Sequence, residues 1–390
     1  MHGNAPALDV DQHTHQCPAL RCKHLLILSC RCRLPKVNHT PVQPADFIPH
    51  RKVIRSWLLP IVKKNTAYAF GLVAMDLTLF ALLLAATVLL AWAVLQVLTG
   101  IAAGLVIGRL FILGHDACHQ SFTPHRRLNR WLGRLVFMPS LTPYSLWDVG
   151  HNVVHHGYTN LKEFDFVWQP LSLEAYQRLP AWRQALERVY RSGWAPWLYY
   201  AMEIWWKRMV FPSRQFMPTR RRIFTLDGLL VTGVAVAWAL GLVYAASATG
   251  QSALWLLGVG FALPLFVWNA LIGFVVYVHH THTSVAWYDN KADWSAASPF
   301  VSTTVHLTFG AGVGTFLHHI MEHTAHHVDM SVPLYRLKQA QALLEAKLPG
   351  RILVQPFSWA WYARTARACK LYDFEQRCWT DFEGRRTSQS

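Results

Sequence analysis

Two long apolar runs limit what this chain can fold into more than any other part of its sequence. They extend from Ala69 to Leu113 and from Ile223 to Val278. An α-helix rises about 1.5 Å per residue and the hydrocarbon core of a bilayer is about 30 Å thick, so each run is roughly twice as long as one crossing requires. We therefore expect each run to form a hairpin of two membrane-spanning helices, with turns near residues 91–99 and 244–253.

The composition indicates a membrane protein rather than a soluble one. Hydrophobic residues make up 53% of the 390 residues and charged residues only 15%, while the net charge is +16. This balance is too apolar for an ordinary soluble domain. Because the basic residues lie between apolar runs and not along a polar face, they suit contact with anionic membrane lipids and not with nucleic acid.

The basic residues also predict the orientation. Four crossings put both termini and the segment 115–222 on one side of the membrane. That segment carries fifteen Lys and Arg residues, the part after residue 279 carries eleven, and the two predicted turns carry none. Such residues collect on the cytoplasmic side. The sequence thus predicts a multi-pass integral membrane protein with both termini and most of its polar mass in the cytoplasm.

The chain divides into three parts. Residues 1–45 mix basic residues with cysteines and histidines whose spacing fits no standard zinc site, and we expect a disordered basic tail there. Residues 46–345 contain the apolar runs and are expected to form one domain, followed by a cytoplasmic C-terminal tail at 346–390. The seven cysteines are odd in number and irregularly spaced, which indicates a reducing compartment and no disulfide framework.

Three dense histidine clusters flank the apolar runs. They read HDACH at 115–119, HNVVHH at 151–156 and HTAHH at 323–327. Residues three or four apart share one face of a helix, so each cluster can direct two or three imidazoles at one point. The sequence therefore predicts an all-α membrane protein whose helical cytoplasmic cap holds a metal centre, with the ligands His115, His119, His151, His155, His156, His323, His326 and His327.

A fourth source of histidine follows the last predicted crossing. The stretch YVHHTHTSVAWYD at 277–289 supplies His279, His280 and His282. We expect a ninth ligand here, His282 in preference to His280. The apolar run ends at Val278, so the chain is expected to leave its helix there, and His282 is then the residue farther into the cytoplasm.

The number of imidazoles points to the chemistry. Eight or nine neutral nitrogens exceed the needs of one four-coordinate zinc and suit two metal ions with open positions. Imidazole binds iron, zinc, copper and nickel alike. A centre at the membrane face implies a lipid-soluble substrate, and attack on an inert hydrocarbon needs a redox metal. The hypothesis is a di-iron centre that uses O2. Carboxylates are expected to orient the imidazoles through their second nitrogen. The candidates are Asp116, Asp148, Asp165 and Glu322.

The clusters, in this order and around paired apolar runs, resemble the three histidine boxes of the membrane fatty acid desaturases. GHDACHQSF at 114–122 is similar to the first box and HNVVHHGYTN at 151–160 to the second. HHTHTSVAWYD at 279–289 and HHIMEHTAHHVDMSVPLYRLKQA at 318–340 are similar to the third box and the segment before it in the acyl-lipid delta-12/omega-3 branch. The resemblance covers about residues 45–345.

The resemblance implies that the eight cluster histidines, together with His282 or His280, bind two iron ions. His318 also matches a family position before the third box, and we expect it to orient a ligand. The resemblance assigns no role to the remaining histidines of this region, which are His125, His279, His306 and His319. Gln120 stands where some relatives have another histidine, which leaves the number of ligands unchanged.

The resemblance also implies a reaction. Fatty acid desaturases remove two hydrogens from adjacent carbons of a long acyl chain and form a cis double bond, while O2 is reduced to water. Electrons arrive from a separate carrier such as ferredoxin or cytochrome b5, and the acyl group is held by a lipid, coenzyme A or acyl carrier protein. A narrow apolar tunnel must bend the chain past the metal. Candidates for its wall are Tyr144, Trp147, Trp168, Tyr277 and Trp287.

Two other classes of function are alternatives. A di-iron membrane hydroxylase or ketolase acting on carotenoids or alkanes also uses histidine boxes, but it inserts oxygen. A zinc-dependent membrane hydrolase or a metal transporter is the second alternative. Transport would place ionisable groups inside the spans, where this sequence has almost none, and hydrolysis needs fewer histidines.

Overall fold

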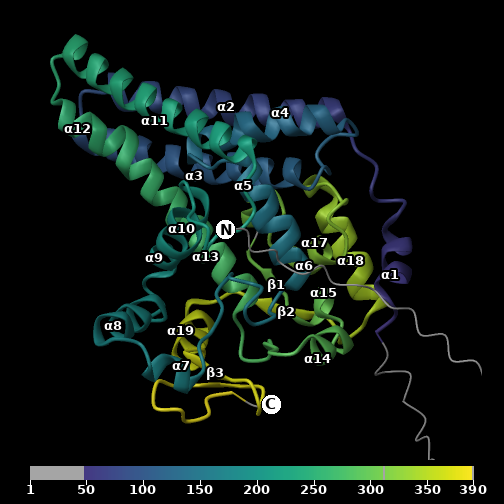
Figure 1. The fold of residues 1–390 in the computed structure, drawn as a ribbon. Coiled ribbons are helices and arrows are strands. Elements are labelled where there is room, and N and C mark those ends of the chain that lie inside the picture. The colour runs from purple at the N-terminus through teal and green to yellow at the C-terminus, as the bar shows by residue number, and fades with distance from the viewer. Residues whose placement is uncertain (1–47, 311, 389–390) are drawn as a thin grey trace, which may run out of the picture. The chain divides into compact units, whose positions relative to one another are not determined.

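The computed structural model describes residues 48–310 and 312–388. The N-terminal tail expected at residues 1–45 lies outside the described residues. The described part is mostly helical and contains two small two-stranded sheets (Figure 1).

Within the described residues, four helices are long and apolar enough to cross a membrane, which confirms the number expected from the sequence. Three of them are α2 (Thr66–Leu89), α3 (Ala93–Cys118) and α11 (Arg222–Thr249). The fourth, Ala253–His280, consists of α12 (Ala253–Leu257), the π-helical turn η5 (Gly258–Ala262) and α13 (Leu263–His280). Residues 90–92 join the first two helices and residues 250–252 join the last two, so each connection is shorter than the sequence predicts.

A row of glycines on α3 allows close packing against the fourth long helix. Gly100, Gly104 and Gly108 are four residues apart and therefore lie on one face of α3. A Cβ atom at Gly104 would lie only 2.6 Å from the carbonyl oxygen of Pro264 and 2.6 Å from the Cβ of Val267. Small residues at such spacing let two helix backbones approach closely in a membrane. This contact brings the histidine-bearing ends of α3 and α13 together.

The charges inside the first two long helices neutralise each other. Asp76 on α2 is fully buried, and its Oδ1 lies 2.8 Å from Nη2 of Arg109 on α3. The other carboxylate oxygen lies 2.8 Å from Nε2 of His318, and Arg109 also donates a hydrogen bond to the carbonyl oxygen of Phe316. A charge in an apolar surrounding persists only when it is paired. This network ties α2 and α3 to the segment that precedes the third histidine cluster.

The remaining helices come in two blocks around the histidine clusters. The first block consists of α1, which precedes the long helices, and of the elements between α3 and α11. Its bounds are α1 Arg51–Leu58, α4 Arg126–Phe137, η2 Met138–Ser140, α5 Tyr144–Asp148, η3 Val149–His155, α6 His156–Tyr158, α7 Leu173–Gln177, α8 Ala181–Tyr190, α9 Pro196–Tyr199, η4 Tyr200–Trp206 and α10 Lys207–Met209. The elements η3 and η4 are π-helical turns.

The second block follows α13 and includes all four strands. Strand β1 pairs in parallel with β2, with Val305 opposite Leu353, and β3 pairs antiparallel with β4. The bounds are α14 Lys291–Ala296, α15 Pro299–Ser302, β1 Val305–Thr308, α16 Val313–Phe316, α17 His323–Val328, η6 Leu334–Arg336, α18 Leu337–Lys347, β2 Leu353–Pro356, α19 Trp359–Ala368, β3 Leu371–Asp373 and β4 Cys378–Thr380.

The C-terminal segment packs against the other described residues. Strand β2 adds to β1, and the buried indole of Trp379 donates hydrogen bonds to the carbonyl oxygens of His282 and Val285. The segment that the sequence predicts as a tail after residue 346 thus covers the part of the chain that follows the fourth long helix. The three cysteines within the described residues are buried and free.

Candidate metal centre

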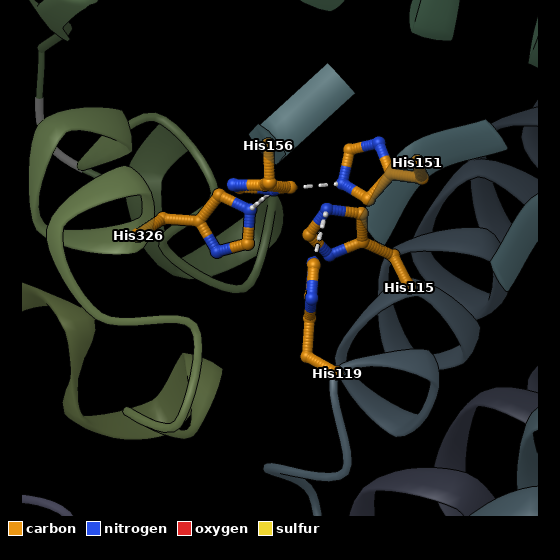
Figure 2. A group of neighbouring side chains, drawn as sticks. All are labelled: His115, His119, His151, His156 and His326. Atoms are coloured by element: carbon orange, nitrogen blue, oxygen red, sulfur yellow. Dashed lines mark hydrogen bonds between the residues drawn. The ribbon is translucent and has the colours of Figure 1, made fainter. Parts of the chain in front are cut away.

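Five histidines from three distant parts of the chain point toward one another (Figure 2). His115 lies in the last turn of α3 and His119 caps that helix. The Nε2 atoms of these two lie 3.3 Å apart. We call the five the first histidine group, and one nitrogen of each lies within 4.8 Å of the others. Its members are His115, His119, His151, His156 and His326.

Four further histidines form the second histidine group by the same criterion of 4.8 Å. Its members are His155, His280, His323 and His327. Nε2 of His323 lies 2.9 Å from Nε2 of His280 and 3.0 Å from Nε2 of His327. Every side chain of this group is buried. The two groups adjoin, because the rings of His156 and His327 stack with their centres 4.1 Å apart.

The π-helical turn η3 explains how the histidine cluster at residues 151–156 supplies imidazoles to both groups. In a π-helix the hydrogen bonds join residues five apart rather than four, and the backbone N–H of His156 donates to the carbonyl oxygen of His151. These two residues therefore share a face, and their Nε2 atoms lie 3.1 Å apart. His155 points elsewhere and joins the second group. In a regular α-helix, the spacing of four residues would instead place His151 on the same face as His155.

Burial keeps six of the grouped imidazoles neutral. Burial lowers the pKa of every cluster histidine that lies beyond the long helices and has a resolved shift, and neighbouring imidazoles lower it further. These residues are His119, His151, His156, His323, His326 and His327. A neutral imidazole offers a lone pair to a metal, whereas a protonated one does not. These six imidazoles are therefore in the charge state that metal binding requires.

The donor set fits two metal ions. Metal–nitrogen bonds of about 2.1 Å place two ligand nitrogens of one ion at most roughly 4.2 Å apart, and the closest nitrogens in each group are 2.9 Å apart. No acidic residue belongs to either group. Neutral nitrogens gathered at this distance cannot all be satisfied by hydrogen bonds to one another, since each ring carries only one N–H. Nitrogen ligands of this kind suit iron, zinc, copper and nickel.

Several contacts hold the imidazoles through Nδ1, the ring nitrogen that does not face the rest of the group. The Nδ1 atom of His155 lies 3.1 Å from Oδ1 of Asp165, which makes Asp165 the one expected carboxylate that contacts a group histidine. The Nδ1 atom of His280 lies 3.2 Å from the carbonyl oxygen of Thr303. The ring of His327 approaches the hydroxyl of Thr159 at 3.3 Å. Such contacts fix the tautomer and the direction of the ligating nitrogen.

The other expected orienting residues have partners elsewhere. Asp116 accepts a hydrogen bond from the hydroxyl of Ser121, and Asp148 accepts one from Asn152. Burial raises the pKa of Asp148. Glu322 contacts His319, and His318 contacts Asp76 on α2. These four residues thus support the segments that carry the groups and do not contact the grouped imidazoles.

The structure brings His280 and not His282 into the second group, whereas the sequence favours His282 as the ninth ligand. The helix α13 does not end at Val278 but continues through His280. His282 lies beyond its end, where Nε2 is 3.4 Å from Oε1 of Gln355. His279, to which the sequence gives no role, stacks on the ring of His323 with the ring centres 3.7 Å apart.

An apolar cavity of about 50 Å³ adjoins both groups. Its walls come from α3, α5, η3, η4, α10, α13 and α17 and from the segments between them, and histidines of both groups line it. Trp147 is the only one of the five predicted tunnel aromatics that lines it. The sequence gives no signal for the contribution of the second π-helical turn. The apolar lining residues include Phe111, Ile112, Trp147, Phe166, Val167, Tyr200, Ile204, Met209, Ile272, Val275, Val276 and Ile320.

Comparison with known proteins shows which family model and which relatives the chain matches. The family model of fatty acid desaturases matches residues 90–359. The chain is 27% identical over 335 residues to an sn-1 oleoyl-lipid 12-desaturase of Synechocystis sp., a match that covers 86% of this chain and 92% of the relative. It is 27% identical over 372 residues to a chloroplastic omega-6 fatty acid desaturase of Spinacia oleracea, which covers 95% and 79%. An sn-1 acyl-lipid omega-3 desaturase (ferredoxin) of Synechocystis sp. is 29% identical over 240 residues, covering 61% and 64%.

Proposed function

The chain belongs to the fatty acid desaturase family, and we propose that it introduces a cis double bond at position 12 of an oleoyl chain carried by a membrane glycerolipid. The enzyme class is that of an oxidoreductase that desaturates fatty acyl chains. The position and the carrier are the proposed part. They rest on relatives named as oleoyl-lipid 12-desaturases and on a relative named as an omega-6 fatty acid desaturase.

One observation carries the proposal most directly. Histidines of both groups form part of the wall of an apolar cavity, so that an apolar chain entering the cavity lies against the metal ligands. The apolar walls exclude water from the reacting carbons, and they hold the chain by contact alone. Insertion of oxygen, as in a hydroxylase, is not favoured, because the named relatives are desaturases.

We propose that the first and second histidine groups each hold one iron ion. When bound, the two irons supply the activation of O2 that removal of hydrogen from an unreactive carbon requires. The chain keeps six of the grouped imidazoles neutral by burial and directs His155 through Asp165. We propose His280 as the ninth ligand in place of His282, because its Nε2 lies 2.9 Å from that of His323.

The proposed arrangement in the membrane is two hairpins with a cytoplasmic cap. The connections at 90–92 and 250–252 would lie on one side, and the histidine groups with both termini on the other, where the basic residues are. We place the catalytic domain at residues 46–345, with residues 346–388 covering its cap. Electrons would come from a separate carrier, for which a relative's name gives ferredoxin as the example.

A second position for the double bond has one supporting observation. A relative at 29% identity is named an omega-3 desaturase, although it covers less of this chain than the 12-desaturase does. An omega-3 enzyme would act on a chain that already has a double bond at position 12. The substrate offered therefore separates the two candidates.

The test is expression in a host whose lipids contain only saturated and monounsaturated chains. We expect gas chromatography with mass spectrometry to show a dienoic chain with a new double bond at position 12. His326→Ala removes a member of the first group and should abolish the product, whereas His125→Ala, at an exposed position outside both groups, should retain it. A hydroxylated product, or a new double bond only when a dienoic chain is supplied, would contradict the proposal.

A further inference from the structure

A second opening leads to the histidine groups from outside the long helices. It is a pocket of about 260 Å³ between α1, α6, α14 and α15, and it reaches His156 and His327. These elements lie outside the four long apolar helices (Figure 1). The pocket is therefore accessible to a soluble molecule, whereas the apolar cavity suits a lipid chain. We call it the polar pocket.

The polar pocket ends where the two groups meet. His156 belongs to the first group and His327 to the second, and their rings stack with the centres 4.1 Å apart and the planes inclined by 29°. The Nε2 atom of His156 lies 2.9 Å from that of His326, and the Nε2 atom of His327 lies 3.0 Å from that of His323. A reactant that arrives at this ring pair is thus next to ligands of both groups.

The charges in and around the polar pocket favour a negatively charged binding partner. Its lining contains the guanidinium group of Arg51 but no carboxylate. Arg51 is held in place because its Nη2 and Nε donate hydrogen bonds to the carbonyl oxygens of His327 and Val328, at 2.7 and 3.0 Å. Lys52 on α1 and Lys291 on α14 are exposed on two of the elements that frame the pocket. Opposite charge on a partner steers association and sets its orientation.

A chain of hydrogen bonds connects the rim to a ligand. Trp294 lines the pocket on α14, and its indole N–H donates to the carbonyl oxygen of Thr159 at 2.8 Å. The hydroxyl of the same threonine lies 3.3 Å from Nδ1 of His327. Trp294 at the rim and the proposed ligand His327 are therefore joined through one residue, Thr159.

We propose that the polar pocket is the docking site of a small acidic protein that carries one electron at a time. This inference rests on the proposed function. Removal of two hydrogens from the acyl chain, with reduction of one O2 to two waters, consumes two electrons and two protons beyond those two hydrogens. Each carrier is oxidised by one electron, so two carriers dock in turn for each double bond. The acyl chain and the carrier then approach the metal ligands from different openings and do not compete for space.

The experiment uses the purified iron-loaded protein with an oleoyl lipid and a plant-type [2Fe–2S] ferredoxin, which is an acidic carrier. For each variant the rate with reduced ferredoxin, below saturation, is divided by the rate with a small reduced dye. We expect Lys52→Glu with Lys291→Glu to lower this ratio at least about tenfold and to weaken its dependence on salt. The control is Arg178→Glu with Arg364→Glu, the same change of charge at exposed residues at the end of α7 and on α19, which do not frame the pocket, and it should leave the ratio within about twofold.

The outcomes separate this inference from the proposed function. Loss of all desaturation with the dye in the unmodified protein would contradict the function, and binding of ferredoxin to the same protein would still be measurable by titration. An unchanged ratio and an unchanged ferredoxin affinity in the pocket variant would overturn the docking site. So would an equal loss in the control, or an effect confined to the dependence on lipid, which would assign the pocket to a lipid headgroup.

Discussion

At the scale of single residues, histidines that are alike in sequence have different roles because of what their second nitrogen contacts. His280 lies in the last turn of α13, where the carbonyl oxygen of Thr303 holds Nδ1 and leaves Nε2 facing His323. His282 is only two residues away, but it lies beyond the helix and accepts a hydrogen bond at Nδ1 from the backbone N–H of Ser284. The end of one helix thus decides which imidazole can reach a metal.

The first prediction compares these two histidines. We expect His280→Ala to lose about one of two irons and most of its activity, since a second group of three imidazoles binds metal more weakly. His282→Ala should keep its iron, because His282 belongs to neither group. Iron content measured on the purified variants decides this, and a loss of iron confined to His282→Ala would assign the ninth ligand to His282 and contradict the proposal. His279→Ala is a useful third variant, because that ring stacks on His323.

At the scale of elements, the sequence predicts those features that follow from the length of apolar runs and the spacing of histidines. The four long helices follow from the length of the apolar runs, and the eight cluster histidines follow from their density. The division into two groups does not follow, because η3 is π-helical and its pattern of residues five apart has no marker in the sequence. The extension of α13 through His280 is likewise invisible in a hydropathy profile, since histidine ends an apolar run without ending the helix.

The second prediction concerns the glycine face of α3. Gly104→Leu should destabilise the protein by more than about 2 kcal/mol, since its Cβ would already overlap backbone and side-chain atoms of α13 and neither helix can move without shifting its histidines. Gly71→Leu on α2 is the matched control, because nothing lies within 4 Å of its Cβ position. Thermal unfolding in detergent measures both. Equal melting temperatures for the two variants would mean that α3 and α13 do not pack as described.

At the scale of the whole molecule, the arrangement separates an apolar part from a polar part that holds the chemistry. The sequence predicts this separation from the distribution of basic residues, but not the structure of the C-terminal segment. Trp379 and Tyr372 are almost completely buried there, yet no periodicity in the sequence distinguishes two short strands from a tail. Their burial depends on contact with the segment after α13, which is remote in the sequence.

The third prediction tests the orientation. In intact cells, a membrane-impermeant maleimide should label Ala248→Cys, which is exposed at the end of α11 beside the connection at 250–252. Ala292→Cys, which is exposed on α14, should be labelled only after the membrane is permeabilised. The native protein provides the background. Labelling of Ala292→Cys in intact cells would place the histidine groups on the outer side and contradict the proposed cytoplasmic cap.

The interleaving of the two histidine groups has a thermodynamic consequence. The turn at 151–156 and the helix α17 each supply imidazoles to both groups. An ion that binds the first group restricts the freedom of the same backbone that must be ordered for the second, so the second ion meets a smaller entropic penalty. If each group holds one ion, as proposed, we expect uptake of the two ions to be linked and positively cooperative, and a protein that holds a single ion to be a minor species during assembly.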